Sequence, residues 1–356
     1  MELHDYQKYA VRFIEEHPIA ALFLDMGLGK TITTLTAIHN LMFDLFAVRK
    51  VLIIAPLRVA RDTWAAEIEK WEHLKDLRYS VAVGTEEERL AALNAPADLY
   101  IINRENVDWL VNNTKFDYDM VVIDELSSFK SHQSKRFKAL MKVRPKVKRI
   151  VGLTGTPASN GLMDLWAEFR LLDMGQRLGR FIGQYRTAYF QPDKRNGMVV
   201  YSYKPLPQAE KQIYDKISDI TISMKAIDYL QMPELLLTEV SVRLSKQERE
   251  RYQQLKQELV LDLPDGEITA NNAASLSNKL SQLANGAVYD DTGAVIPIHN
   301  RKLDALEDLI EAANGKPVLV AYWFKHDLER IQERLRKLKV SYQEIQSSDS
   351  IRNWNA

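Results

Sequence analysis

The chain lacks cysteine altogether, which excludes disulfide bonds, thiol catalysis and cysteine-ligated zinc. Histidine is also scarce, and the seven histidines form no His-x3-His or His-Glu pair, so we expect no histidine metal site. Apolar runs such as Ile19–Leu24 are far shorter than the roughly 20 residues of a membrane-spanning helix. The first residues are polar and show no secretory signal. Together these absences predict a cytoplasmic protein.

The sequence also lacks an excess of charge of either sign, because Lys+Arg and Asp+Glu both number 48. Zero net charge excludes a globally basic nucleic-acid binder, although a local basic groove is compatible with it. Hydrophobic residues make up 46% and charged residues 27% of the chain, which is ordinary usage for a globular protein. At about 150 residues per domain, the chain length predicts two or three domains.

Residues 1–175 alternate between strand-like and helix-like patterns. Short apolar runs rich in Val, Ile and Leu end in polar residues or in Gly and Pro, and amphipathic stretches separate them. Runs of this kind are typical of strands buried on both faces. The pattern therefore predicts an α/β domain with a parallel sheet flanked by helices. The runs are Ala20–Leu24, Val51–Ala55, Tyr79–Val83, Leu99–Ile102, Met120–Ile123 and Ile150–Leu153.

After residue 175 the alternation breaks, and it resumes near residue 231. We interpret residues 176–230 as a helical insertion or connector, and residues 231–356 as a partial second domain of the same α/β type. The aromatic stretch 322–324 is predicted to lie in its core. In this part, strands are predicted at 238–244, 318–322 and 340–344, and helices at 246–260, 302–313 and 327–338.

A glycine-rich segment, Asp25–Thr31, follows the first strand pattern and opens a helix-forming stretch, as a phosphate-binding loop does. Gly27 and Gly29 allow the backbone to curl, so that successive N–H groups and the helix N-terminus form an anion cradle. Lys30 would then reach the β- and γ-phosphates, and the Thr31 hydroxyl would bind Mg²⁺. The alternative is a plain strand-to-helix turn in which Lys30 is a solvated charge.

Two further motifs follow strand patterns. Asp124 and Glu125 come after the fifth pattern, where Asp124 would hold Mg²⁺ through water and Glu125 would orient and polarise the attacking water. Thr154, Gly155 and Thr156 form a turn after the sixth pattern. Taken alone, a surface strand end and a simple loop explain these two motifs better than a binding site does. Because ligands of open α/β sheets bind along the carboxyl ends of the strands, three motifs in this order predict one site.

These motifs together resemble superfamily-two helicases, and most closely the Swi/Snf-type translocases on double-stranded DNA. Leu3–Gln7 resembles the opening element of the family, which implies that Gln7 contacts adenine. Met26–Thr31 resembles motif I, Asp124–Ser127 motif II and Leu153–Pro157 motif III. The resemblance implies nucleotide contacts from Gln7, Met26, Gly27, Leu28, Gly29, Lys30 and Thr31, a metal site at Thr31 and Asp124, catalytic roles for Lys30 and Glu125, and coupling by Thr154, Gly155 and Thr156.

The resemblance further implies a RecA-like P-loop lobe followed by a partial second RecA-like lobe, with ATP and Mg²⁺ bound in the cleft between them. It implies a motor that steps along duplex DNA, in a chain of phage or bacterial origin that we expect to be a monomer. Phosphate contacts should dominate DNA binding and make it salt-sensitive. Candidates for these contacts are Arg58, Lys130 and Arg180.

Two departures from the family affect the expected activity. Motif II ends in Leu126 and Ser127, where the family has a histidine that links the nucleotide to motif III. Motifs V and VI, with their arginine fingers, are absent before the chain ends at Ala356. We therefore expect a truncated chain that binds ATP but hydrolyses it weakly, because loss of an arginine finger costs about 10³–10⁵ in rate.

Two other functions remain open from the sequence. The first is an RNA or single-strand helicase, and the second is a non-catalytic ATP-binding module that interacts with DNA or protein. We interpret the basic run Lys142–Arg149 as a solvated loop in preference to a DNA-binding patch. Trp64 and Trp71 lie at helical spacing and are predicted to be core residues.

Overall fold

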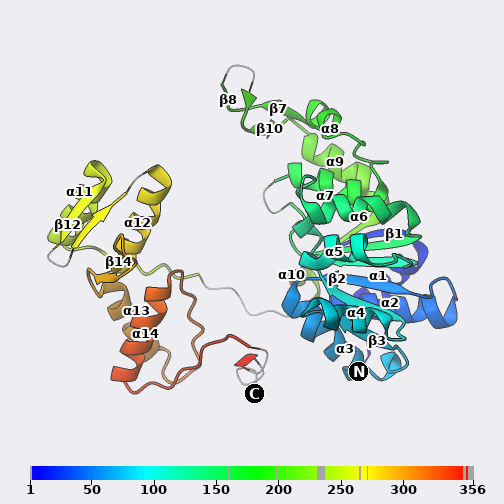
Figure 1. Cartoon of the computed structure of the whole chain (residues 1–356), viewed down its shortest axis with the longest axis horizontal. Coiled ribbons are helices and arrows are strands. Elements are labelled where there is room, and N and C mark those ends of the chain that lie inside the picture. Colours follow the sequence, from blue (N-terminus) through cyan, green and yellow to red (C-terminus); the bar gives the residue numbers. More distant parts are fainter. Residues whose placement is uncertain are drawn as a thin grey trace. The chain divides into compact units, whose positions relative to one another are not determined.

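The structure is a computed structural model that describes residues 2–158, 161–196, 199–230, 237–263, 266–270, 272–347 and 350–351. The chain divides into two compact units, residues 1–233 and 234–356 (Figure 1). In the described part of the chain, no helix combines the length and the apolar composition needed to cross a membrane.

The first unit is built on a sheet of seven strands in the order β11-β1-β6-β5-β2-β4-β3. Every neighbouring pair in this sheet is parallel. All of the strands predicted in residues 1–175 are present, so the prediction of a parallel α/β domain is confirmed. The strands are β1 (Ile19–Leu24), β2 (Val51–Ala55), β3 (Tyr79–Ala82), β4 (Leu99–Asn103), β5 (Met120–Asp124), β6 (Arg149–Thr154) and β11 (Thr221–Met224).

Helices connect these strands and lie around the sheet (Figure 1). Short helical turns occur between them: η2 (Val59–Thr63), η5 (Leu126–Phe129) and η6 (Arg144–Lys146). Two small antiparallel sheets are also present. One consists of β7 (Phe190–Pro192) and β10 (Tyr203–Pro205), and the other of β8 (Arg195–Asn196) and β9 (Val199–Val200). The helices are α1 (Asp5–Glu16), α2 (Lys30–His39), α3 (Trp64–Lys70), α4 (Glu86–Asn94), α5 (Val107–Asn113), α6 (Lys135–Val143), α7 (Met163–Asp173), α8 (Ile182–Tyr189), α9 (Ala209–Ile217) and α10 (Ala226–Tyr229).

Alternate residues of each central strand fill two separate hydrophobic cores. On β1, Leu22 and Leu24 pack in the core that contains α1, α2 and α3, whereas Ala21 and Phe23 pack in the core that contains α5 to α9. Successive side chains of a strand point to opposite faces of the sheet, so a strand covered on both faces must be apolar throughout. This burial explains the continuous apolar runs in the sequence.

Residues 176–230, which the sequence suggested as a connector, belong to the first unit. β11 extends the sheet at its edge by pairing with β1, and α9 adds Ile213 and Ile217 to the core beneath α7 and α8. β11 buries only Ile222 and Met224 among its four residues. An edge strand this short produces no long apolar run, which is why the sequence pattern did not indicate it.

The second unit contains helices close to the predicted ranges but not the predicted strands. Among the described residues, no strand forms at 238–244, 318–322 or 340–344. Extended segments become strands only when their backbones pair with a neighbour, and here Leu319 and Trp323 are 68% and 85% exposed. The prediction that residues 322–324 are core is therefore wrong for Trp323.

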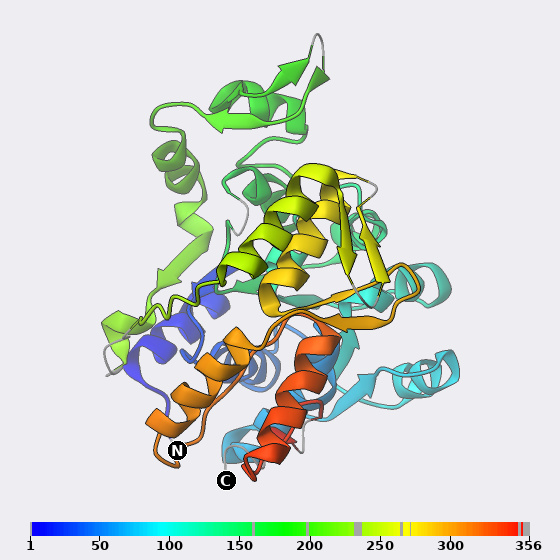
Figure 2. The ribbon, with the colours of Figure 1, turned by 90° about the vertical axis from the view of Figure 1, so that its left-hand side faces the viewer.

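The elements that do form in the second unit are helices and two hairpins. In Figure 2, α11 and α12 lie side by side, and they contact each other. A small core of Leu255, Leu261, Leu283 and Val288 joins them to the hairpins. The elements are α11 (Lys246–Glu258), α12 (Ala273–Asn285), α13 (Arg301–Ala312) and α14 (Lys325–Lys337), with hairpins of β12 (Val260–Leu263) and β13 (Gly266–Thr269), and of β14 (Ala287–Tyr289) and β15 (Val295–Pro297).

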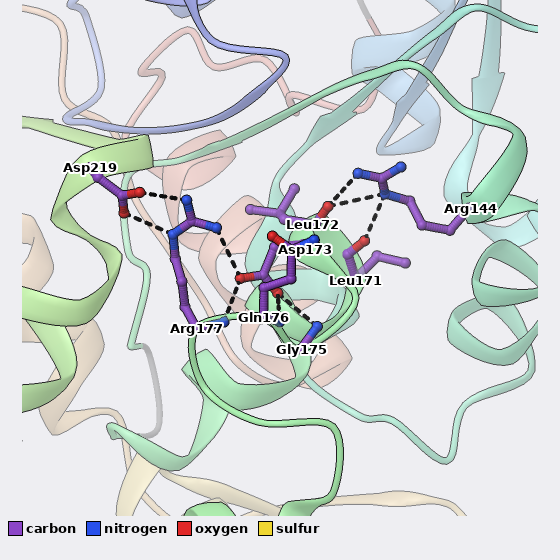
Figure 3. A network of polar contacts seen from close by, with 8 residues as sticks. All are labelled: Arg144, Leu171, Leu172, Asp173, Gly175, Gln176, Arg177 and Asp219. Carbon is purple, nitrogen blue, oxygen red and sulfur yellow. Dashed lines mark hydrogen bonds and ion pairs between the residues drawn. The ribbon is translucent and has the colours of Figure 1, made fainter.

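Two arginines of the basic run 142–149 are structural. The guanidinium of Arg144 is buried and donates to the carbonyls of Leu171 and Leu172 at the end of α7 (Figure 3). Arg149 donates in the same way to the carbonyl of Ile14 near the end of α1. The last carbonyls of a helix lack intrahelical partners and carry partial negative charge, so an arginine satisfies them well. The interpretation of a solvated loop is therefore wrong for these two residues.

The buried carboxylate of Asp173 organises the turn that follows α7 (Figure 3). It accepts hydrogen bonds from the backbone N–H groups of Gly175, Gln176 and Arg177 at 2.7, 3.1 and 2.9 Å. The Arg177 guanidinium lies 3.3 Å from Asp173 and also pairs with Asp219. Arg177 thus links the turn after α7 to Asp219, which lies just after α9.

Replacing Asp173 with alanine should lower the free energy of unfolding by about 3–5 kcal/mol, because buried donors and a partly buried arginine lose their acceptor. Urea denaturation measures the change. Asp219→Ala is the matched control, since it removes the more exposed partner of the same arginine and should cost about 1 kcal/mol or less. Equal losses in the two variants would contradict the role assigned to Asp173.

Candidate nucleotide site

Three neighbouring strands bring the three sequence motifs to one edge of the sheet. β1 lies beside β6, and β6 lies beside β5, with all three parallel. Their carboxyl ends lead into the glycine loop, into the Thr154–Thr156 turn and into Asp124 and Glu125 respectively. The strand order therefore places the turn between the loop and the acidic pair.

The glycine loop has the backbone shape that its glycines permit. Gly27 and Gly29 have φ of +86° and +74°, in the left-handed region, and Gly29 is the N-cap of α2. The Gln7 amide donates to the carbonyl of Leu28 at 3.2 Å, so Gln7 supports the loop from α1. A Cβ atom on Gly29 would lie 2.3 Å from the Gln7 amide nitrogen, at the end of a side chain that can move, so it is the left-handed φ that requires glycine here. Leu28 is buried, whereas Met26 is 84% exposed.

Lys30 lies at the centre of the site, at the first position of α2 and directly before the half-buried Thr31. Its ammonium donates to the carbonyl of Leu24 at 2.7 Å. Burial lowers the pKa of Lys30, and the negative charges of Asp124, Glu125 and Asp25 oppose that shift. The three carboxylates therefore lie within electrostatic reach of this ammonium group.

Gly155 of the motif III turn lies beside Lys30 and the end of β1. A Cβ atom at position 155 would lie 3.6 Å from the Lys30 ammonium nitrogen and 3.3 Å from the carbonyl oxygen of Leu24. The second distance is tighter than ordinary van der Waals contact, so a side chain there would press on the backbone before the glycine loop. The motif III turn and the glycine loop are thus in direct contact.

Asp124 is positioned by a tryptophan for which the sequence indicated only a core role. The Trp64 indole N–H donates to the Asp124 carboxylate at 3.0 Å, and the Trp64 side chain is fully buried. Burial raises the pKa of Asp124, while the Trp64 hydrogen bond and the charge of Lys30 oppose the rise. A buried indole needs an acceptor for its N–H, but the sequence does not reveal which acceptor it finds.

Glu125 connects motif II directly to motif III. One oxygen of its carboxylate accepts hydrogen bonds from the Thr154 hydroxyl at 3.1 Å and from the Ser127 hydroxyl. The Thr154 hydroxyl in turn accepts from the backbone N–H of Thr156 at 3.1 Å. Glu125 itself has φ of +61°, a strained backbone conformation for a residue with a side chain. The Thr154 hydroxyl therefore joins motif III directly to motif II.

A further contact joins the glycine loop to the end of the first unit. The Asp25 carboxylate accepts from the backbone N–H of Ala226 at 2.9 Å, and the Asp25 N–H donates to the carbonyl of Met224 at 3.1 Å. The rings of Tyr6 and Tyr229 pack at a centroid distance of 4.8 Å beside this contact. The sequence does not indicate these partners, because about 200 residues separate them along the chain.

The three candidate DNA-binding residues lie on separate elements. Arg58 is exposed at the N-cap of η2, directly after the carboxyl end of β2. Lys130 lies at the end of η5 and pairs with Asp164 of α7 at 3.9 Å. Arg180 is exposed in the segment between α7 and α8. Arg58 and Lys130 thus follow two strands of the same sheet edge.

Comparisons with known proteins agree on one family. Residues 6–287 match the SNF2-related domain family. The protein p41 of Acyrthosiphon pisum secondary endosymbiont phage 1 is 37% identical over 343 residues, which cover 94% of this chain and 75% of p41. The uncharacterized ATP-dependent helicase MG018 of Mycoplasma genitalium is 24% identical over 366 residues, which cover 99% of this chain and 33% of that protein.

A solved structure shows the same fold. The Sulfolobus solfataricus SWI2/SNF2 ATPase core in complex with dsDNA aligns with a TM-score of 0.55 and 20% identity, covering 98% of this chain and 74% of that one. The parallel sheet flanked by helices is thus the RecA-like arrangement of such ATPase cores. Because the family match includes most of the chain and p41 is similar over most of its length, the chain belongs to the SNF2-related family, the Swi/Snf-type ATPases of helicase superfamily two.

Proposed function

We propose that this chain is an ATP-driven motor on double-stranded DNA, with ATP and Mg²⁺ bound at the carboxyl edge of the first sheet. The observation that supports the proposal most directly is the convergence of Lys30, Asp124 and Glu125. In this arrangement the Lys30 ammonium, the partly buried Asp124 carboxylate and the Glu125 carboxylate, carried on a strained backbone, act on one another beside a glycine loop. A phosphate-transfer site needs these groups, because its catalysis consists of positioning and charge stabilisation.

Each residue has a distinct part in this proposal. The N–H groups of the Met26–Gly29 loop and the start of α2 hold the phosphates, and Lys30 leaves the Leu24 carbonyl to neutralise their charge. Glu125 orients the attacking water and accepts its proton. Thr154, bonded to Glu125, transmits the state of the site through the motif III turn, and Gly155 keeps that turn against the loop. Gln7 supports the loop, and its amide, which here binds the Leu28 carbonyl and the His4 N–H, would contact adenine.

The donor set fits Mg²⁺ held largely by its substrate. The Asp124 carboxylate and the Thr31 hydroxyl are oxygen ligands of the kind that Mg²⁺ prefers. Within the described ranges, no three His, Cys, Asp or Glu side chains form a group that could hold a metal ion. This agrees with a Mg²⁺ ion that keeps several waters and binds through one or two protein groups plus phosphates. When bound, the ion would neutralise charge that develops between the phosphates.

Duplex DNA is the proposed track because the structurally similar SWI2/SNF2 ATPase core is described in complex with dsDNA. Arg58, Lys130 and Arg180 are the proposed phosphate contacts. A chain with no net charge must bind DNA through such a local set of cations. Binding of this kind releases counterions and therefore weakens steeply with salt.

An ATPase assay with three nucleic acids tests the proposal. We expect duplex DNA to stimulate hydrolysis more than single-stranded DNA or RNA, and we expect the stimulation to fall as salt rises from about 50 to 200 mM. Stronger stimulation by RNA or by single strands would favour the alternative helicase function. ATP binding without hydrolysis under any condition would favour the non-catalytic module. The turnover rate in the same assay tests the expectation of weak hydrolysis.

A further inference from the structure

Glu168, in the middle of α7, has no part in the chemistry described above. Its side chain is fully buried, and neither carboxyl oxygen has a hydrogen-bond partner among the described residues. An ionised carboxylate without a partner is so unfavourable in an apolar interior that the group takes up a proton instead. Burial accordingly raises the pKa of Glu168 well above its ordinary value.

The helix that carries Glu168 packs against the catalytic motifs. α7 contacts η5, which begins directly after Glu125, and it also contacts β1 and β6. After burial, the negative charges of Asp164 and Glu125 are the next largest causes of the raised pKa of Glu168. Lys130 acts in the opposite direction, but it is already paired with Asp164 at 3.9 Å. Glu168 and Glu125 therefore share one electrostatic environment.

Besides these charged groups, the described residues that interact with Glu168 include two tyrosines. Tyr185 of α8 and Tyr214 of α9 interact with Glu168, and burial raises the pKa of both phenols, so both stay neutral. The Tyr185 hydroxyl donates to the carbonyl of Leu162 at 2.7 Å and is already used. If Glu168 were ionised, its negative charge would therefore repel the carboxylate of Glu125.

We propose that Glu168 is a positioning residue for ATP hydrolysis: as a protonated, neutral carboxyl group it spares Glu125 from repulsion and leaves it bonded to Thr154 and Ser127. This inference rests on the role of Glu125 in the proposed function. Ionisation of Glu168 at alkaline pH would repel the Glu125 carboxylate from these two hydroxyl groups. The neutral group thus keeps the carboxylate that orients the attacking water in place.

The first experiment asks whether Glu168 holds a proton in the folded chain. Urea unfolding of the full chain and of Glu168→Gln is followed by tryptophan fluorescence from about pH 5 to about pH 9. With a raised folded-state pKa, the parent loses stability relative to the variant as pH rises from the unfolded towards the folded pKa. The ratio of the two unfolding constants should change by up to about tenfold per pH unit, the slope for one proton.

An exposed glutamate provides the matched control for unfolding. Glu87→Gln, in the first turn of α4, should leave the pH dependence parallel to that of the parent. Glu168→Leu removes the carboxyl group with similar volume and should follow Glu168→Gln. If the ratio of unfolding constants for Glu168→Gln does not change with pH, Glu168 holds no proton and the proposal is overturned.

The second experiment asks whether the proton matters for the reaction. The pH profile of kcat/KM is measured with duplex DNA for the parent and for Glu168→Gln, which mimics the protonated form and should match the parent near neutral pH. At alkaline pH the parent should lose activity that the variant keeps. Lys30, whose pKa burial lowers, titrates in both proteins and cancels in the comparison.

The outcomes separate this inference from the proposed function. Superposable pH profiles in an active enzyme, or a loss of about 100-fold in Glu168→Gln at neutral pH, overturn the positioning role of Glu168 alone. A parent without ATPase activity overturns the proposed function and, with it, the positioning role. A parent that loses activity at alkaline pH, beside a Glu168→Gln variant that keeps it, supports both.

Discussion

Replacing Lys30 with alanine is expected to raise the Kd for ATP by more than about 100-fold, which amounts to abolished binding in an ordinary titration. The change removes the positive charge that the proposed site directs at the terminal phosphates. It also leaves Asp124 and Glu125 without the cation that acts on both. The pKa of Asp124, already raised by burial, should then rise further, because the charge of Lys30 opposes that rise.

Binding of a fluorescent ATP analogue measures the effect, with far-UV circular dichroism as evidence of folding. Lys148→Ala is the matched control. Lys148 lies just before β6, at the amino ends of the strands and away from the proposed site, and it pairs with Asp119, so its loss should leave the Kd unchanged. A folded Lys30→Ala variant that binds the analogue as tightly as the parent would remove the basis of the proposed nucleotide site.

Glu125→Gln is expected to preserve ATP binding and to lower kcat by about 10²–10⁴, the range for loss of a general base. Glutamine has the same shape and keeps a carbonyl oxygen that accepts from the Thr154 and Ser127 hydroxyls. It also tolerates the left-handed backbone at this position no worse than glutamate. The variant therefore removes the charge with little change in the geometry that surrounds it.

Single-turnover hydrolysis with bound ATP separates this chemical step from binding. Glu87→Gln, an exposed glutamate of α4, should hydrolyse at the parent rate. Hydrolysis by Glu125→Gln at the parent rate would show that another group activates the water. In that case Asp124, whose pKa is raised by burial, is the next residue to replace.

The sequence alone determined six of the seven strands of the first sheet and the order of its motifs. The apolar runs predicted its six main strands because a strand buried on both faces must be apolar along its whole length. The glycine, lysine, acidic and threonine residues that directly follow three of these runs then located the candidate site. In both cases the signal is local, since each run or motif occupies a few consecutive residues and obeys a backbone or burial constraint of its own.

The tertiary structure decided which residues become partners. Trp64 donates to Asp124, and Asp25 binds the backbone at Ala226, although the sequence indicated neither pair. Arg144 is buried because the end of α7 offers carbonyls to it, not because of its neighbours in the basic run. The predicted strands of the second unit lack ladder partners in the described structure and stay unpaired. Strand pairing and the burial of a charged side chain depend on residues that are distant in the sequence. A local sequence pattern therefore does not predict them.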